Sequence, residues 1–190
     1  MKYLQIVLGV LCCFGQCPQL FGEERISSST RPNIILVMPD DAGYGDYACL
    51  GNPVMQTPSV DAFMKQSMLF TRFHVSPTCA PCRGALMSGR HEFKNGITHT
   101  IGGRERMAIT THTLPQMLTS AGYSTGIFGK WHLGDEDAYR PENRGFDEVY
   151  IHGSGGIGQS GDAPGNTNND PTLWHNGKFV RTKGYCTDLF

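Results

Sequence analysis

The sequence predicts an α/β fold, because strand-like and helix-like segments alternate along the chain. The first strand-like segment, Asn33 to Met38, ends in five aliphatic residues with no polar alternation. A short apolar run of this kind is typical of a strand buried on both faces, as in a parallel sheet covered by helices. In such folds ligands bind beyond the carboxyl ends of the strands, so the residues that follow each strand are candidate site residues.

The first helix is expected at Ser59 to Met68, with Thr57 as N-cap and Pro58 at the first helical position. It carries an apolar stripe at helical spacing, which we interpret as a core-facing surface: Val60, Phe63, Met64 and Met68.

Further elements alternate in the same way. Leu69 to Val75 is compatible with a second strand, and Leu114 to Ala121 with a helix capped by Thr113 and stopped by Gly122. Tyr123 to Phe128 then predicts another strand.

The C-terminal part is rich in turn residues. His152 to Asp170 has no periodicity and predicts a long loop. Trp174 to Val180 contains Asn176-Gly177 between apolar residues, which indicates a hairpin. No internal repeat is visible.

Composition excludes several classes of protein. Of the 190 residues, 39% are hydrophobic and 17% charged, with 16 basic against 17 acidic side chains. Disordered, coiled-coil and collagen sequences differ from this balance, and the length predicts one domain or at most two. A nucleic-acid partner or an anionic membrane would call for a basic excess, so we expect neither.

The N-terminus has the pattern of a secretory signal peptide at residues 1–22. A short positive start precedes the apolar run Leu4 to Phe14, which is too short to span a membrane stably. A polar leader at residues 23–30 follows. The sequence therefore predicts a secreted or periplasmic protein, whose mature chain keeps four cysteines: Cys49, Cys79, Cys82 and Cys186.

Asp40 and Asp41 directly follow the first predicted strand. Where the chain turns after a strand, two adjacent carboxylates can converge, and a hard cation such as Ca²⁺ or Mg²⁺ would offset their repulsion. The same pair before Ala-Gly also fits an ordinary turn.

The segment Cys79-Ala80-Pro81-Cys82-Arg83 admits several interpretations. A C-x-x-C pair resembles a thioredoxin-type redox site, but no Trp adjoins it and no apolar strand leads into it. A zinc site would need a second Cys or His pair at suitable spacing. A structural disulfide or two buried thiols remain open.

Lys130 and His132 come directly after the Tyr123 to Phe128 strand. At a strand end both side chains can face one cleft, offering a fixed cation and a group that exchanges protons near neutral pH. A surface Lys and a partly buried His are the alternative. Taken with Asp40, Asp41 and Arg83, the set suits an anionic substrate and a divalent metal.

Three motifs in order resemble the type I sulfatases. They are Pro32 to Val37 leading into Asp40-Asp41, Cys79-x-Pro81-x-Arg83 leading into Ser88-Gly89-Arg90, and Gly122-Tyr123-x-Thr125 leading into Gly129 to Gly134. Pro141 to Asp147 is also similar to a segment of that family. The resemblance implies an alkaline-phosphatase-like sandwich, with a mixed, mainly parallel sheet between helices, of which residues 31–190 would be an incomplete N-terminal part.

The resemblance also implies a mechanism. The residue matching Cys79 is converted to Cα-formylglycine by a formylglycine-generating enzyme that reads C-x-P-x-R, and the hydrated aldehyde attacks sulfur. Asp40, Asp41 and the modified Cys79 would bind Ca²⁺, with Mg²⁺ as the other option. Arg83 would hold the diol, Lys130 would contact the sulfate, and His132 would take a proton. The implied substrates are sulfated carbohydrates or aryl sulfates.

The sequence departs from the family pattern at two places. Position 82 is Cys where the family most often has Ser, so a disulfide between Cys79 and Cys82 could compete with modification. The family's downstream metal and leaving-group residues have no match after Gly177. Two other functions therefore stand beside a sulfatase: a truncated, catalytically inactive product, and a thiol-disulfide oxidoreductase using Cys79 and Cys82.

Overall fold

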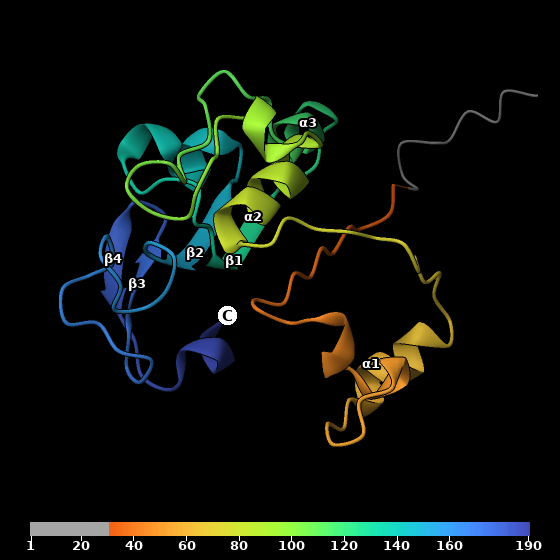
Figure 1. Ribbon diagram of the computed structural model, residues 1–190. Helices are drawn as coiled ribbons and strands as arrows, with labels where there is room; N and C mark the ends of the chain where they lie inside the picture. Colours follow the sequence, from red (N-terminus) through yellow and green to blue (C-terminus); the bar gives the residue numbers. More distant parts are fainter. Residues whose placement is uncertain (1–30) are drawn as a thin grey trace, which may run out of the picture. The chain divides into compact units, whose positions relative to one another are not determined.

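The computed structural model describes residues 31–190 (Figure 1). The predicted signal peptide and polar leader lie outside the described residues. Of the described residues, 31–38 belong to one unit and those from Pro39 onward to another, and each unit is described by itself. Within residues 31–190, no helix has the length and apolar character needed to cross a membrane.

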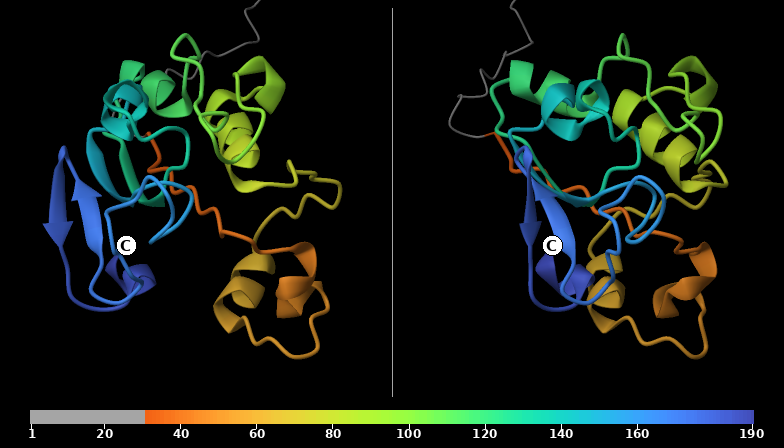
Figure 2. Two further views of the ribbon diagram at one scale, coloured as in Figure 1. Left: turned by 60° about the vertical axis from the view of Figure 1, so that its left-hand side comes forward. Right: turned by 90° about the vertical axis from the view of Figure 1, so that its left-hand side faces the viewer.

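The second unit combines three α-helices with a four-stranded sheet. The elements are α1 (Pro58–Met64), α2 (Cys79–Ser88), α3 (Leu114–Ser120), β1 (Gly126–Lys130), β2 (Glu148–His152), β3 (Thr172–His175) and β4 (Lys178–Arg181). The strand order is β1-β2-β3-β4; β1 and β2 are parallel, and the two following pairs are antiparallel (Figure 2). The expected α/β class and mixed sheet are confirmed.

The strands β3 and β4 form the expected hairpin. They are joined by Asn176 and Gly177, whose φ angles are 44° and 87°. Positive φ at both central residues is the requirement of a type I′ turn, for which Asn-Gly is the preferred pair.

Helix α3 begins and ends close to the predicted positions. The Thr113 hydroxyl accepts from the Gln116 amide, and the Gln116 side chain accepts from the Thr113 amide, which completes a capping box. Gly122, with φ of 83°, follows the helix end. The next strand, predicted at Tyr123 to Phe128, forms two to three residues later as β1.

The predicted first strand does not form within its own unit. Residues 31–38 contain no helix or strand, and Ile34 and Ile35 are 56% and 87% exposed. A strand exists only when a neighbour pairs with its backbone groups, which apolar composition alone does not supply. The expectation that this segment is buried on both faces is therefore wrong for the described unit.

The apolar stripe on the first helix is also not a core surface. Helix α1 begins at Pro58 as predicted but ends at Met64, and Phe63 and Met68 are 73% and 80% exposed. The Thr57 hydroxyl bonds Asp61 and the Ala48 amide instead of capping the helix. The suggested strand at Leu69 to Val75 is absent, because no described strand pairs with it.

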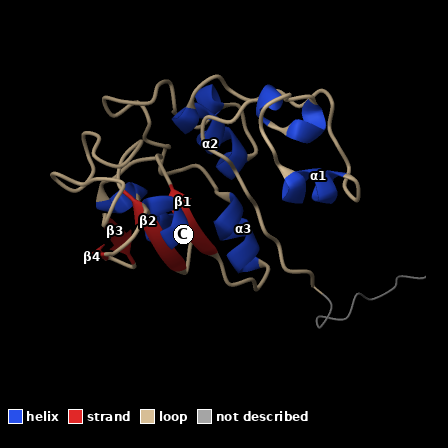
Figure 3. Ribbon diagram, turned by 90° about the horizontal axis from the view of Figure 1, so that it is seen from below, coloured by secondary structure: helices blue, strands red, loops and turns tan. Residues whose placement is uncertain are grey.

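The core lies between α2 and one face of the sheet. Its buried members are Ala80, Ile97, Met107, Trp131, Leu133, Val149 and Ile151. Figure 3 shows α2 and α3 near β1 and β2. Because alternate residues of a strand share a face, Ile127, Val149 and Ile151 face the core to which Ala80 of α2 contributes, whereas Phe128, on the other face, is 57% exposed.

The residues after β2 form the expected long loop. Its fold depends on Asp162, whose carboxylate accepts from the backbone amides of Gly153 and Gly158 and from the Asn166 side chain. One carboxylate therefore holds both ends of the turn, which fixes the loop without regular secondary structure.

Candidate active site

Asp40, Arg83 and Lys130 meet at the carboxyl end of β1. The Lys130 ammonium donates to Asp40 Oδ2 at 2.7 Å, and the Arg83 guanidinium lies 3.2 Å from Asp40 Oδ1. The Lys130 and Arg83 side chains are each 10% exposed, and that of Asp40 is 43% exposed. The structure thus gathers three predicted site residues from three separate segments.

The two cations change the acidity of Asp40. Burial by itself raises the pKa of this carboxyl group, but the hydrogen bonds and positive charges of Lys130 and Arg83 outweigh it, so the pKa lies below its ordinary value. Asp40 is therefore a carboxylate across the physiological range. The structure thereby places a negatively charged oxygen at the opening of the site.

Arg83 connects the elements around the site. It lies one turn after Cys79 in α2, and its Nη1 donates to the backbone carbonyl of Lys130 at 2.5 Å. Its Nε is buried without a hydrogen-bond partner. The planar guanidinium presents several donors in fixed directions, so it sets the spacing between α2, the end of β1 and Asp40.

Cys79 is the first residue of α2, and Cys82 follows three positions later. Both thiols are free and partly exposed. Burial raises the pKa of the Cys82 thiol. Cys79 is thus accessible at a helix start, beside the turn that carries Arg83.

His132 follows β1 in a left-handed backbone conformation, with φ of 58°. It is 5% exposed, and its Nε2 lies 2.8 Å from the Thr100 carbonyl. Because a carbonyl only accepts, Nε2 carries the proton and Nδ1, which is buried without a partner, is free to accept one. Burial lowers the pKa of His132, and the charges of Lys130 and Arg83 lower it further, which favours a neutral imidazole.

Asp41 is not part of the described cluster. It is exposed, has φ of 55°, and bonds none of the other candidate residues in residues 31–190. Within that range, no group of three or more His, Cys, Asp and Glu side chains gathers as a metal site. Asp40 and Asp41 do offer carboxylate oxygens, the donor type that Ca²⁺ and Mg²⁺ prefer.

Two residues near the site were not predicted from the sequence. His152 pairs in register with Lys130 across the parallel strands, and Asp135 lies three residues after His132. Burial lowers the pKa of His152 and raises that of Asp135. Carboxyl ends of neighbouring parallel strands lie at the same edge of a sheet, so a strand predicted at Glu148 to His152 would have identified His152. No strand was predicted there from the sequence.

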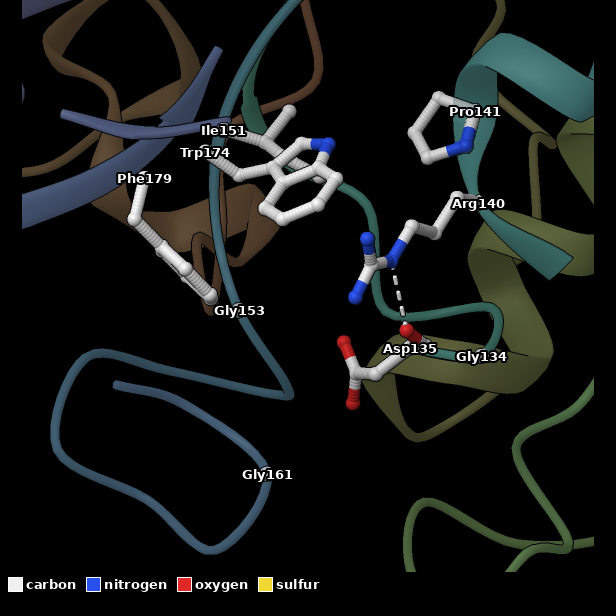
Figure 4. Close-up of a pocket in the computed structure, with 9 residues that line it drawn as sticks. All are labelled: Gly134, Asp135, Arg140, Pro141, Ile151, Gly153, Gly161, Trp174 and Phe179. Atoms are coloured by element: carbon white, nitrogen blue, oxygen red, sulfur yellow. Dashed lines mark hydrogen bonds between the residues drawn. The ribbon is translucent and has the colours of Figure 1, made fainter. Parts of the chain in front are cut away.

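Two cavities lie beside these residues. The smaller, of about 60 Å³, is lined by Gly134, Asp135, Arg140, Pro141, Ile151, Gly153, Gly161, Trp174 and Phe179 (Figure 4). The larger, of about 330 Å³, is lined by Thr100, Ile101, Gly102, Glu105, Arg106, Asp135, Glu136, Ser154, Ser160 and Gly161. Asp135 and Gly161 border both.

Sequence comparisons point to one family. The sulfatase family matches residues 32–189. N-acetylgalactosamine-6-sulfatase of Sus scrofa is 40% identical over 131 residues, which are 63% of this chain and 25% of that protein. Arylsulfatase G of Homo sapiens is 38% identical over 134 residues, 66% of this chain and 25% of that protein. The chain thus spans about a quarter of the length of these relatives.

Solved structures of similar fold point to the same family. The crystal structure of Ps i-CgsB matches with a TM-score of 0.69 and 30% identity over 83% of this chain and 39% of that one. BT4656, in complex with its substrate D-glucosamine-2-N,6-O-disulfate, matches with a TM-score of 0.69 and 32% identity over 84% of this chain and 29% of that one. These matches agree with the alkaline-phosphatase-like class, and the chain belongs to the sulfatase family.

Proposed function

We propose that the protein hydrolyses sulfate esters of carbohydrates or aryl alcohols. The observation that carries this proposal is the meeting of Lys130 and Arg83 at Asp40, one helical turn from Cys79. Two cations at a strand end attract a sulfate group, and family membership gives the reaction class.

Cys79 would supply the nucleophile after conversion to Cα-formylglycine by a formylglycine-generating enzyme. Its position at the start of α2, with a free and partly exposed thiol, is compatible with access by such an enzyme. One hydroxyl group of the hydrated aldehyde would attack sulfur and displace the alcohol of the ester. The second hydroxyl would then lose its proton, expel sulfate and restore the aldehyde.

Lys130 and Arg83 would offset negative charge on the sulfate, while Asp40 keeps both cations in place. His132 would accept a proton at Nδ1, because its Nε2 already donates to Thr100. A neutral imidazole with one free lone pair is the form that a general base requires.

A divalent cation, Ca²⁺ or Mg²⁺, would be held by Asp40 and Asp41 together with ligands beyond this set. Asp40 fits that role, because it is ionised and partly exposed. When bound, the cation polarises the oxygens of the sulfate group.

The proposal is tested by peptide mass spectrometry and by activity. A peptide spanning Cys79 should show the sulfur replaced by an aldehyde, and hydrolysis of a synthetic aryl sulfate should disappear in Cys79→Ala and after chelation. Cys49→Ala, outside the cluster, is the control. Full activity in Cys79→Ala would overturn the mechanism, and no hydrolysis by the unaltered chain would favour the catalytically inactive alternative.

We further propose that the protein is exported to an oxidising compartment, on the basis of the predicted signal at residues 1–22. Sequencing of the mature N-terminus tests this directly. A mature chain that keeps Met1 would contradict export with cleavage.

A further inference from the structure

Two loops line the larger cavity, and both lie beside His132, the base proposed above. Residues 100–106 form one wall and residues 154–161 the other, with Asp135 and Glu136 between them. Its volume of about 330 Å³ lies within the range of small-molecule sites. Charged and hydroxyl side chains alternate with apolar surface in its lining, so it suits a ligand that has both hydrogen-bonding groups and an apolar face.

This cavity adjoins His132. Thr100, which lines it, accepts the hydrogen bond from His132 Nε2 at 2.8 Å. On the other wall, a Cβ placed on Gly155 would lie 2.6 Å from Cε1 of His132, so the loop beside Ser154 packs directly on the imidazole. Thr100 therefore lies between the cavity and the imidazole, which itself does not line the cavity.

Asp135 is fixed in position at the boundary of the cavity. Its Oδ1 accepts from the Ser154 amide at 2.8 Å, and its backbone carbonyl accepts from Arg140 Nε at 2.8 Å (Figure 4). The Arg140 guanidinium is itself held 3.6 Å above the Trp174 ring. Since Arg140 bonds the main chain, the Asp135 carboxylate keeps acceptor capacity for a ligand.

The charge of the lining is predominantly negative. Three carboxylates, from Glu105, Asp135 and Glu136, face one guanidinium, Arg106, which already pairs with Glu136. Glu105 Oε2 is buried without a hydrogen-bond partner. Glu105 and Asp135 thus form no salt bridge within residues 31–190, although the charge of Arg106 also acts on Glu105, and a ligand that donates N–H or O–H groups would satisfy them.

Charges of both signs act on His132. Lys130 and Arg83 act on the imidazole as cations, and Asp135 acts on it as an anion, which in turn interacts with Glu105 and Glu136. A substrate with a sulfate at one end and hydrogen-bond donors at the other matches this polarity.

Resting on the function proposed above, we propose that this cavity binds the sugar ring of the substrate and selects rings without a carboxylate. Amino sugars and neutral hexoses present only donors and uncharged acceptors to Glu105 and Asp135. A uronic acid would place a like charge beside them, which is unfavourable where water is partly excluded.

Direct binding of unsulfated sugars tests the subsite without catalysis. Methyl glycosides of glucosamine, glucose and glucuronic acid are titrated into the full-length protein by calorimetry or by saturation-transfer NMR. We expect glucosamine to bind about 10-fold or more tightly than glucuronic acid, with glucose between them. Equal affinities, tighter binding of the uronic acid, or no binding of any of the three would overturn the proposal.

Variants that remove a negative charge show whether Glu105 and Asp135 cause the preference for glucosamine over glucuronic acid. Glu105→Gln and Asp135→Asn keep the size of the side chain and one acceptor oxygen but remove the charge, and Asp135→Asn can still accept from Ser154. Each variant should reduce the ratio of glucosamine to glucuronic acid affinity several-fold. Glu148→Gln, on β2 and outside the cavity, should leave the preference unchanged. An unchanged preference in both cavity variants, with thermal melts showing folded protein, would exclude these carboxylates as its source.

Hydrolysis of an aryl sulfate is measured in parallel, so the two proposals fail separately. Absent hydrolysis with the sugar preference intact would overturn the sulfatase activity but leave a sugar site. Hydrolysis with no sugar preference would retain the activity and overturn the subsite.

Discussion

The Asp40 carboxylate accepts a hydrogen bond of 2.7 Å from the Lys130 ammonium, across 90 positions of sequence. Lys130 is almost buried and Asp40 is half exposed, so the pair lies at the opening of the site. A sulfate group that binds there would compete with Asp40 for the same ammonium. The ion pair therefore fixes the direction of the lysine ammonium at the opening of the site.

Lys130→Met should separate this functional role from stability. Met keeps the length of the stem but removes the charge, so we expect kcat/KM for an aryl sulfate to fall about 10²- to 10³-fold. The free energy of unfolding should change by less than about 1 kcal/mol, since Asp40 is partly exposed and keeps Arg83 as a partner. Lys178→Met, on the exposed strand β4, is the control; an equal loss of activity there would contradict the assignment.

Arg144→Met should destabilise the fold. Arg144 is 2% exposed and donates to the backbone carbonyls of Ala108, Ile109 and Thr111. Removing the guanidinium leaves these acceptors without a donor, so we expect a loss of about 3 kcal/mol or more in urea unfolding. Arg181→Met, exposed on β4, should change stability by less than about 0.5 kcal/mol. Similar values for both variants would show that the three carbonyl bonds contribute little.

Gly145→Ala should also destabilise, for steric reasons. Gly145 has φ of 104°, and a Cβ there would lie 2.6 Å from the Gln116 amide nitrogen at the start of α3. Gly165 has φ of 71° but no atom within 4 Å of the added Cβ, so Gly165→Ala measures the backbone cost alone. We expect about 1 kcal/mol for Gly165→Ala and at least about 3 kcal/mol for Gly145→Ala. Equal losses would mean that α3 moves aside without cost.

The two buried histidines should make stability depend on pH. Burial lowers the pKa of both His132 and His152 below the ordinary value of 6.5, so below that pH the unfolded chain binds protons that the folded chain does not. Their contribution is complete above pH 6.5 and is lost as pH falls toward the folded pKa values, by up to about 1.4 kcal/mol per pH unit for each histidine.

His152→Asn should reduce that slope, because the Asn amide can still donate to the Gly153 carbonyl without titrating. His99→Gln, at an exposed position, should leave the slope unchanged. The raised pKa of Asp135 acts in the opposite sense from pH 3.8 upward, so variants are compared at the same pH by urea unfolding. An identical slope in His152→Asn would contradict the prediction.

Cys82→Ser should increase conversion of Cys79. The two thiols lie three residues apart in the first turn of α2, a spacing at which a disulfide can form. In an oxidising compartment that bond would remove the thiol that the modifying enzyme needs. Mass spectrometry should therefore find a larger aldehyde fraction at Cys79 in Cys82→Ser than in the unaltered protein or in Cys49→Ser. Equal fractions in all three would show that Cys82 does not compete.

Local sequence signals predicted the elements whose formation depends on neighbouring residues. The Asn176-Gly177 turn and the Thr113 cap need only a few adjacent side chains, and both occur as expected. The predicted burial of residues 34–38 and of the apolar stripe on α1 was wrong for the opposite reason. Burial requires a packing partner, and apolar periodicity does not show which segment that partner is. The spacing of apolar residues predicted that α1 is a helix, but it did not predict which part of the protein would pack against its apolar side chains.

The candidate site shows the same division. Motif order predicted Asp40, Arg83 and Lys130, and these three lie together. Asp135, Thr100 and His152 were missed, because their roles come from loop packing and from the pairing of β1 with β2. Outside the family motifs, no local pattern in the sequence identified residues whose contacts lie in a distant chain segment, such as Thr100 with His132.

Arg83 couples the effects of mutations at the candidate site. Its guanidinium donates to both the Lys130 carbonyl and the Asp40 carboxylate, so one side chain fixes the position of α2 relative to the end of β1. Substitutions at Asp40, Arg83 and Lys130 should then be non-additive, with most of the loss reached by the first change. These three positions should therefore respond to mutation as one unit.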